Sequence, residues 1–139
     1  MSKALSPDYR PTRAEPFMNA QMLEYFKQKL LAWREELILE SEETLHHLQE
    51  ENLHQPDITD RATLETDNSL ELRRRDRQRK LISKIDSALR RIQDGSYGYC
   101  EESGEPIGIE RLEARPIATL SIEAQERHER YERTHNDDL

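Results

Sequence analysis

The chain has 139 residues, of which 36% are charged and 34% are hydrophobic, and its formal net charge is -8. This composition leaves too little apolar material for a deep globular core, but it suits long helices that bury one narrow stripe. The negative charge disfavours bulk attraction to nucleic acid or membranes, and the single cysteine excludes an internal disulfide. Because the sequence has no long apolar stretch and no apolar leader, it predicts a cytoplasmic protein.

The N-terminal residues, 1–18, contain three prolines among charged residues, and we expect an arm that packs on a globular base. Helical periodicity starts after Asn19, a candidate N-cap. The next apolar residues recur at spacings of 3, 4, 3 and 4, which is typical of the seam between paired helices: Leu23, Phe26, Leu30, Trp33 and Leu37. Since no proline or glycine interrupts residues 21–55, a first helix is predicted there.

The turn that follows begins at Pro56, and Thr59 or Asp60 is expected to cap a second helix from about Arg61 to Gln93. Its seam is clearest near its end, at Leu81 or Ile82, Ile85, Leu89 and Ile92. Two helices of similar length with a short connection predict an antiparallel coiled-coil hairpin over residues 19–94, with a polar tip at 56–62. Phe26 and Trp33 lie on the seam and are interpreted as core residues.

The sequence changes character after Gly95, where apolar residues alternate with turns that contain glycine and proline. This pattern predicts a small knuckle over residues 95–124 whose apolar residues are buried: Tyr97, Tyr99, Ile107, Ile109, Leu112, Ile117, Leu120 and Ile122. A charged helix from Ile122 to about Arg133 follows, so that residues 125–139 form a C-terminal helix and tail. The predicted fold class is therefore all-α, a long antiparallel coiled-coil hairpin with a small globular base and a C-terminal helix.

Three segments of the chain resemble the DksA family: the turn Asp57–Ala62, the run Ser69–Ile82, and the block from Tyr97 to Pro116. The last block is the most specific, because a generic coiled coil would not reproduce it. The resemblance implies a monomeric regulator, not an enzyme, that enters the secondary channel of bacterial RNA polymerase without sequence-specific DNA binding. It also implies action with ppGpp to destabilise promoter complexes, including ribosomal RNA promoters in the stringent response.

The family's zinc-binding cysteine pairs correspond in this chain to Cys100, Ser103, Ser121 and Ala124. Serine is a poor zinc ligand and alanine is none, and although His128 and His135 are near in sequence, structural zinc takes four N or S ligands at defined spacing. The knuckle is therefore predicted to be a degenerate zinc finger that folds without zinc. Glu101 and Glu102 are expected to discourage the thiolate form of Cys100, which disfavours a redox role.

The resemblance places Asp57, Asp60 and Ala62 at the hairpin tip, where the family acts near the polymerase catalytic centre. Spacing alone also allows the two aspartates to shape the turn and cap a helix, and both roles can hold at once. Two tip carboxylates could instead hold a catalytic Mg²⁺ and promote transcript cleavage, as Gre-type factors do. A coiled-coil adaptor or chaperone is a further alternative, and it would not need the three residues together.

The segment from Arg73 to Lys80 contains six basic residues among eight, a pattern typical of a solvated helix face. The resemblance implies a ppGpp site beside the polymerase rim formed by Arg77, Leu81 and Lys84, with Arg73 as a further polymerase contact. Arg77, Leu81 and Lys84 are spaced so that they share one helical face. A family lysine corresponds here to Gln125, so weaker ppGpp binding is expected.

Overall fold

The structure is a computed structural model that describes residues 5–52 and 58–137, without the side chains of residues 51, 52, 58–62, 64, 136 and 137. Its helices are α1 (Ala20–Asn52), α2 (Ile58–Asp94), α3 (Ile109–Ala114) and α4 (Ile122–Asp137). Over these residues the only β-structure is one isolated antiparallel bridge, between Tyr99 and Pro106, so the predicted all-α fold is confirmed. None of the helices in the described ranges is long and apolar enough to cross a membrane.

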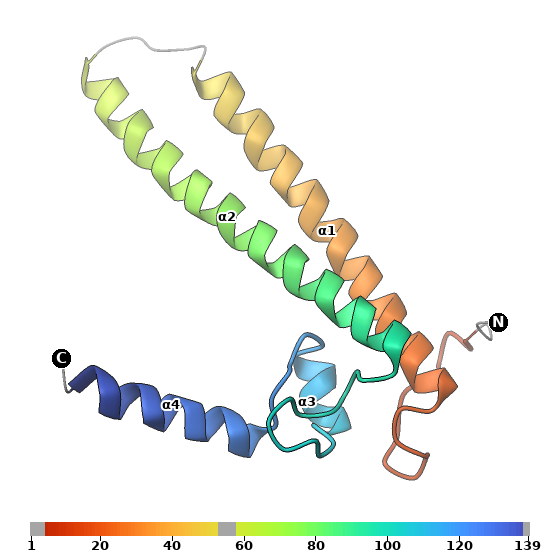
Figure 1. Ribbon diagram of the computed structural model, residues 1–139. Coiled ribbons are helices and arrows are strands. Elements are labelled where there is room, and N and C mark those ends of the chain that lie inside the picture. Colours follow the sequence, from red (N-terminus) through yellow and green to blue (C-terminus); the bar gives the residue numbers. More distant parts are fainter. Residues whose placement is uncertain (1–4, 53–57, 138–139) are drawn as a thin grey trace. The chain divides into compact units, whose positions relative to one another are not determined.

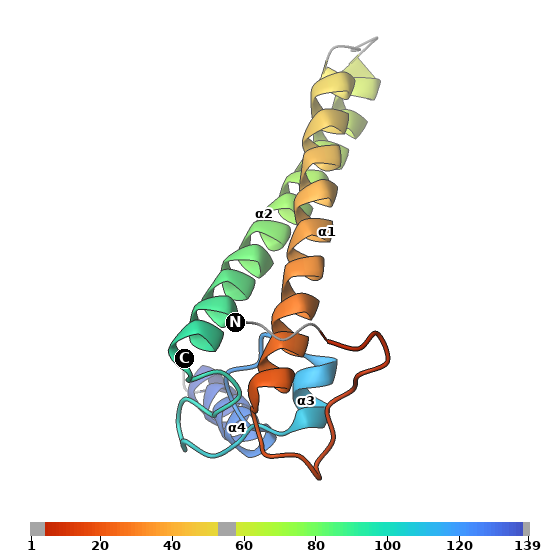
Figure 2. The same cartoon turned by 90° about the vertical axis from the view of Figure 1, so that its right-hand side faces the viewer.

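Two compact units make up the chain: a hairpin unit, Leu31–Ser87, and a knuckle unit, Met1–Leu30 with Ala88–Leu139. Within the hairpin unit, α1 and α2 run antiparallel and side by side, as both views show (Figures 1 and 2). Leu37, Leu48 and Ile85 are buried between them. Trp33 is only half-buried, which corrects its interpretation as a core residue, because two helices alone do not cover so large a side chain.

The start of α1 follows the sequence prediction, because the Asn19 side chain caps it by accepting a hydrogen bond from the Met22 N–H at 2.9 Å. The start of α2 does not. This helix begins at Ile58, so Thr59 and Asp60 lie inside it and neither is its N-cap. Residues 58–61 contain no proline or glycine, so nothing in them stops the helix from continuing toward its N-terminus. The predicted helix end at residue 55 and Pro56 lie outside the described residues.

The knuckle unit has its own core, built around Phe26 and Tyr97, whose ring centroids lie 5.7 Å apart. The Tyr97 hydroxyl donates to the Pro116 carbonyl at 2.7 Å, so its polar end is satisfied although the side chain is buried. Further buried side chains are contributed by the start of α1 and by residues 100–124: Met22, Leu30, Cys100, Ile107, Ile109, Leu112, Ile117, Ala118 and Ala124. Phe26 is therefore confirmed as a core residue.

Two residues expected in this core, Tyr99 and Ile122, are exposed. Tyr99 packs edge-on against Phe17 of the N-terminal arm, with ring centroids 5.4 Å apart. Ile122 is the first residue of α4, where a helix places consecutive side chains on different faces, and Ala124 is the buried one. The apolar pattern of residues 97–122 identified the knuckle but not every residue that fills it.

Turn residues set the remaining helix ends. Gly95 adopts φ 87°, and the Arg91 carbonyl accepts hydrogen bonds from the backbone N–H groups of Gly95, Ser96 and Tyr97 at 2.9, 3.0 and 3.2 Å. This left-handed glycine ends α2 where the sequence predicted a break. The Ser121 hydroxyl accepts from the Ala124 N–H at 3.2 Å and so caps α4, which runs to Asp137, beyond its predicted end near Arg133.

Candidate functional site

The predicted ppGpp and polymerase residues Arg73, Arg77, Leu81 and Lys84 all lie on α2 in the hairpin unit. Arg73, Arg77 and Lys84 are exposed, whereas Leu81 is half-buried. Gln125 lies on α4 in the knuckle unit, where its Nε2 donates to Glu129 Oε1 at 3.3 Å. The structure therefore gathers four of these five residues on one helix, three of them open to solvent.

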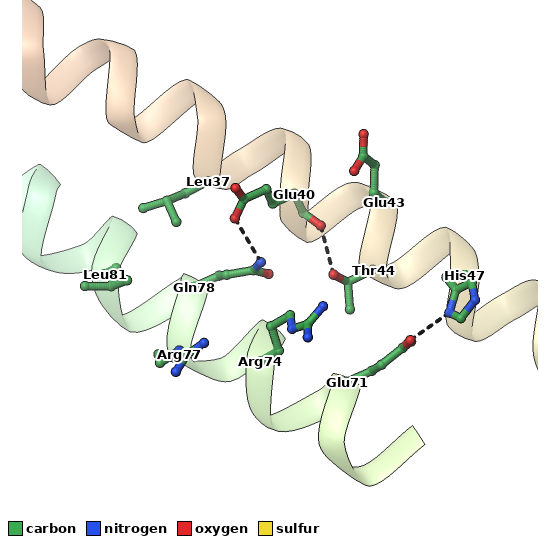
Figure 3. A pocket seen from close by; sticks show the side chains of 10 residues that line it. All are labelled: Leu37, Glu40, Glu43, Thr44, His47, Glu71, Arg74, Arg77, Gln78 and Leu81. Carbon is green, nitrogen blue, oxygen red and sulfur yellow. Dashed lines mark hydrogen bonds and ion pairs between the residues drawn. The ribbon is translucent and has the colours of Figure 1, made fainter. Parts of the chain in front are cut away.

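A groove of about 840 Å³ lies between α1 and α2, and Arg77 and Leu81 are among the residues that line it (Figure 3). The others are mostly polar: Leu37, Glu40, Glu43, Thr44, His47, Glu71, Arg74 and Gln78. Gln78 and Glu71 reach from α2 toward α1, where Gln78 Nε2 donates to Glu40 Oε2 at 3.4 Å and Glu71 Oε1 lies 2.7 Å from His47 Nδ1 (Figure 3).

The charges of this groove limit what it can bind. Its three glutamates oppose an anion inside it, although the guanidinium groups of Arg74 and Arg77 are well suited to phosphate. A pyrophosphate is therefore better served by the exposed Arg73, Arg77 and Lys84 than by the groove interior. The sequence analysis missed the groove, and the signal for it was the polar stretch that interrupts the apolar seam of α1 at residues 40–44.

The structure describes the backbone of two of the three predicted tip residues. Asp57 lies outside the described residues, so its prediction has no structural counterpart. Asp60 and Ala62 lie in the first turns of α2, which begins at Ile58, and the structure does not describe their side chains.

The four positions that the resemblance assigns to the family's zinc ligands all belong to the knuckle unit. Cys100 is buried, and the groups that stabilise its thiolate are the Ser103 hydroxyl and the backbone amides of Ser121, Ser103 and Glu102. Ser121 and Ala124 are also buried, at the start of α4. The two segments that carry these positions are in contact, because the Glu101 N–H donates to the Thr119 carbonyl at 2.9 Å.

Burial raises the pKa of the Cys100 thiol, but the hydrogen bonds from Ser103 and from the backbone amides outweigh burial and lower the pKa to about 6. This corrects the expectation that Glu101 and Glu102 keep the thiol protonated. Their carboxylates are engaged elsewhere, because Glu101 lies 3.7 Å from Arg91 and Glu102 pairs with both Arg127 and His128.

These side chains do not fit a zinc ion. One thiol, two hydroxyls and a methyl group do not supply four N or S ligands. His128 is held by Glu102, and the His135 ring stacks on Tyr131 with centroids 3.7 Å apart. In the part of the chain that the structure describes, no three His, Cys, Asp or Glu side chains are grouped to hold a metal.

Two family models match consecutive parts of the chain. The model described as "DnaK suppressor protein DksA, N-terminal domain" matches residues 22–92, and "Prokaryotic dksA/traR C4-type zinc finger" matches residues 95–130. The first model thus covers the helical hairpin and the second covers the knuckle, so the chain has the two-part architecture of the class that these models describe. The chain belongs to the DksA family, although it keeps only one cysteine in the region matched by the C4-type model.

Relatives and a solved structure support this assignment. A protein of Caulobacter vibrioides (strain NA1000 / CB15N), named "RNA polymerase-binding transcription factor DksA", is 71% identical over 131 residues, which cover 94% of this chain and 92% of that protein. The Escherichia coli (strain K12) protein of the same name is 47% identical over 117 residues, covering 84% and 78%. The structure of transcription factor DksA2 from Pseudomonas aeruginosa matches with a TM-score of 0.80 and 41% identity, covering 86% of this chain and 95% of that one.

Proposed function

We propose that the chain binds bacterial RNA polymerase through the secondary channel and regulates transcription initiation together with ppGpp, in the cytoplasm and as a monomer. The observation that carries the proposal is the 71% identity, over nearly the whole chain, to a relative named for RNA polymerase binding. The paired helices of the hairpin unit supply the element that such a factor inserts. In this role the chain is a regulator rather than an enzyme, and it destabilises promoter complexes, including those at ribosomal RNA promoters.

Asp57, Asp60 and Ala62 are proposed to act at the hairpin tip, near the polymerase catalytic centre. Support comes from their place in the sequence, because all three follow Asn52, where α1 ends, and Asp60 and Ala62 belong to the first turns of α2, which begins at Ile58. Carboxylates can act there through charge or hydrogen bonding, and the net charge of -8 disfavours direct binding to DNA. No base readout is needed for this mechanism.

The ppGpp contact is proposed to involve Arg73, Arg77, Leu81 and Lys84. The three basic side chains are exposed on α2, and guanidinium and ammonium groups both bind phosphate oxygens. Gln125 stands where the family has a lysine, so this chain is proposed to respond to ppGpp with lower sensitivity.

The knuckle is proposed to fold without zinc. The buried aromatic and aliphatic side chains, the Ser121 cap and the Tyr97–Pro116 hydrogen bond supply contacts that need no metal. The test is the zinc content of the purified protein and its thermal unfolding in EDTA. We expect no stoichiometric zinc and an unchanged Tm, and one bound zinc or EDTA-induced unfolding would contradict the proposal.

In vitro transcription from a ribosomal RNA promoter, with and without ppGpp, tests the regulatory function. We expect the chain to reduce transcript yield, and Asp57→Asn and Asp60→Asn to abolish the reduction while binding to polymerase persists. Asp67→Asn, at an exposed position of α2, is the matched control and should behave as the unmodified chain does. Normal repression by the tip variants would overturn the tip assignment.

The alternatives give different results in the same system. If the chain neither binds polymerase nor changes transcript yield, the result favours the hypothesis of a coiled-coil adaptor or chaperone. Stalled elongation complexes separate regulation from cleavage, because a Gre-like factor releases short RNA fragments in the presence of Mg²⁺. We expect no such fragments.

A further inference from the structure

The hairpin unit has an apolar seam at one end of α2 and a polar seam further toward its start. Ile85 and Ile82 occupy seam positions of α2. Counting from Ile82 toward the N-terminus at spacings of 4, 3, 4 and 3 residues, the next four seam positions hold polar residues. These are Gln78, Arg75, Glu71 and Asn68, and we call them the polar seam. A coiled coil normally places apolar residues at such positions, so two heptads of polar residues require an explanation.

Several side-chain atoms of the polar seam are buried without a hydrogen-bond partner. Gln78 is 5% exposed, and its Oε1 has no partner in the described part of the protein. The same holds for Arg75 Nε and Glu71 Oε2. Buried polar atoms that lack hydrogen bonds destabilise the packed state, because water would satisfy them in an open state.

The opposite helix offers little compensation. The Thr44 hydroxyl donates to the Glu40 carbonyl of its own helix at 2.9 Å, and not across to α2 (Figure 3). The bond from Gln78 to Glu40 is long at 3.4 Å, whereas His47 and Glu71 form a close pair at 2.7 Å. Leu48 is the buried apolar residue of this stretch of α1. By comparison, the other end of the hairpin unit has Leu37 and Ile85 buried and a short Arg34–Asp86 pair at 2.7 Å.

We propose that the polar seam is a point of local opening, at which α1 and α2 separate over residues 40–48 and 68–78 while the apolar seam stays packed. When the helices separate, water can form hydrogen bonds with Gln78, Arg75 and Glu71. Opening of the apolar seam brings no such hydrogen bonds, so it costs more free energy. The groove does not call for a particular ligand, because its lining combines three glutamates with two arginines. This inference concerns the free protein and goes beyond the proposed function.

Amide hydrogen exchange of the full chain, measured without polymerase, tests the proposal. We expect amides of residues 68–78 to exchange about tenfold faster, or more, than those of residues 81–87. Gln78→Leu should slow exchange at residues 68–78 about tenfold, because it replaces an unsatisfied amide with a side chain suited to the seam. Gln93→Leu makes the same change at an exposed position of α2 and should leave these rates unchanged.

Equal exchange rates in the two stretches of the unmodified chain would overturn the proposal, as would Gln78→Leu leaving the rates of residues 68–78 unchanged. If Gln78→Leu does not fold, Arg75→Leu provides the second test, with Arg79→Leu at an exposed position as its control. Because polymerase is absent from the experiment, its failure is distinct from failure of the proposed function.

Discussion

Lys29 holds Glu113 through two hydrogen bonds, one from Nζ to the carboxylate at 2.9 Å and one from Nζ to the backbone carbonyl at 2.7 Å. The Tyr25 hydroxyl donates to the same carboxylate at 3.0 Å. Lys29 and Tyr25 belong to α1, and Glu113 belongs to α3. This cluster therefore joins two helices of the knuckle unit without using any of the degenerate zinc positions.

Replacing Lys29 by methionine should lower the free energy of unfolding by about 1 kcal/mol, because the charged hydrogen bonds are partly screened by solvent. Methionine keeps most of the length of the side chain and removes the ammonium group. Urea denaturation followed by circular dichroism measures the effect. Lys27→Met, at an exposed position of the same helix, is the matched control, and equal losses in the two variants would contradict the assignment.

Glu113 should make the stability of the chain sensitive to acid. Burial raises its pKa, but the hydrogen bonds from Tyr25 and Lys29 and the charges of Lys29 and Arg10 outweigh burial and lower the pKa. A carboxyl whose pKa is lower in the folded state stabilises the protein above its unfolded pKa, and this contribution is lost as the pH falls through the folded pKa.

The stability difference between the unmodified chain and Glu113→Gln should therefore be largest near neutral pH and shrink between about pH 5 and about pH 3. Urea titrations at several pH values measure this difference. A difference that stays constant over that range would show that the carboxylate charge of Glu113 does not contribute.

Local sequence rules predicted those parts of the fold that local interactions determine. The Asn19 cap and the break at Gly95 depend on contacts within a few residues, and both were predicted correctly. The apolar seam predicted the pairing of the helices, and the apolar residues and turns after Gly95 predicted the knuckle. The predicted start of α2 was wrong because Thr59 and Asp60, which are common N-caps, are also tolerated inside a helix.

The chemistry of the candidate site depends on contacts between residues far apart in the chain, which sequence spacing does not reveal. The pKa of Cys100 is set partly by the backbone amide of Ser121, whereas the sequence analysis considered only the neighbouring Glu101 and Glu102. The pairing of Glu102 with His128 was likewise not visible, since 26 residues separate them.

Removing the Ser103 hydroxyl should raise the pKa of Cys100 above its value of about 6, because the thiolate loses a hydrogen-bond donor while the thiol remains buried. Ultraviolet absorbance of the thiolate as a function of pH measures the midpoint directly. Ser83→Ala, at an exposed position of α2, should leave it unchanged. An unaltered midpoint in Ser103→Ala would assign the lowered pKa to the backbone amides alone.

The backbone of the knuckle should accept zinc once the missing thiols are supplied. The Cys100 sulfur already lies against Ser103 and Ser121, so Ser103→Cys, Ser121→Cys and Ala124→Cys together provide a four-thiolate set. We expect one zinc per chain and a Tm that rises with zinc and falls in EDTA. The single Ser103→Cys variant is the control and should bind no zinc tightly, because two thiolates leave the site open. A triple variant without zinc would show that the four positions no longer have tetrahedral geometry.

Gln125→Lys should sharpen the response to ppGpp, on the basis of the proposed function. The substitution introduces the cation that the resemblance to the family implies at this position, and its cost is small because the bond from Gln125 to Glu129 is exposed and 3.3 Å long. Charged hydrogen bonds to phosphate are strong, so the ppGpp concentration for half-maximal repression should fall by about threefold to tenfold. Repression without ppGpp should not change, and Gln93→Lys, at an exposed position of α2, should shift neither quantity. Titration of ppGpp in the ribosomal promoter assay measures the shift. Identical curves for the unmodified chain and Gln125→Lys would show that residue 125 lies outside the ppGpp site.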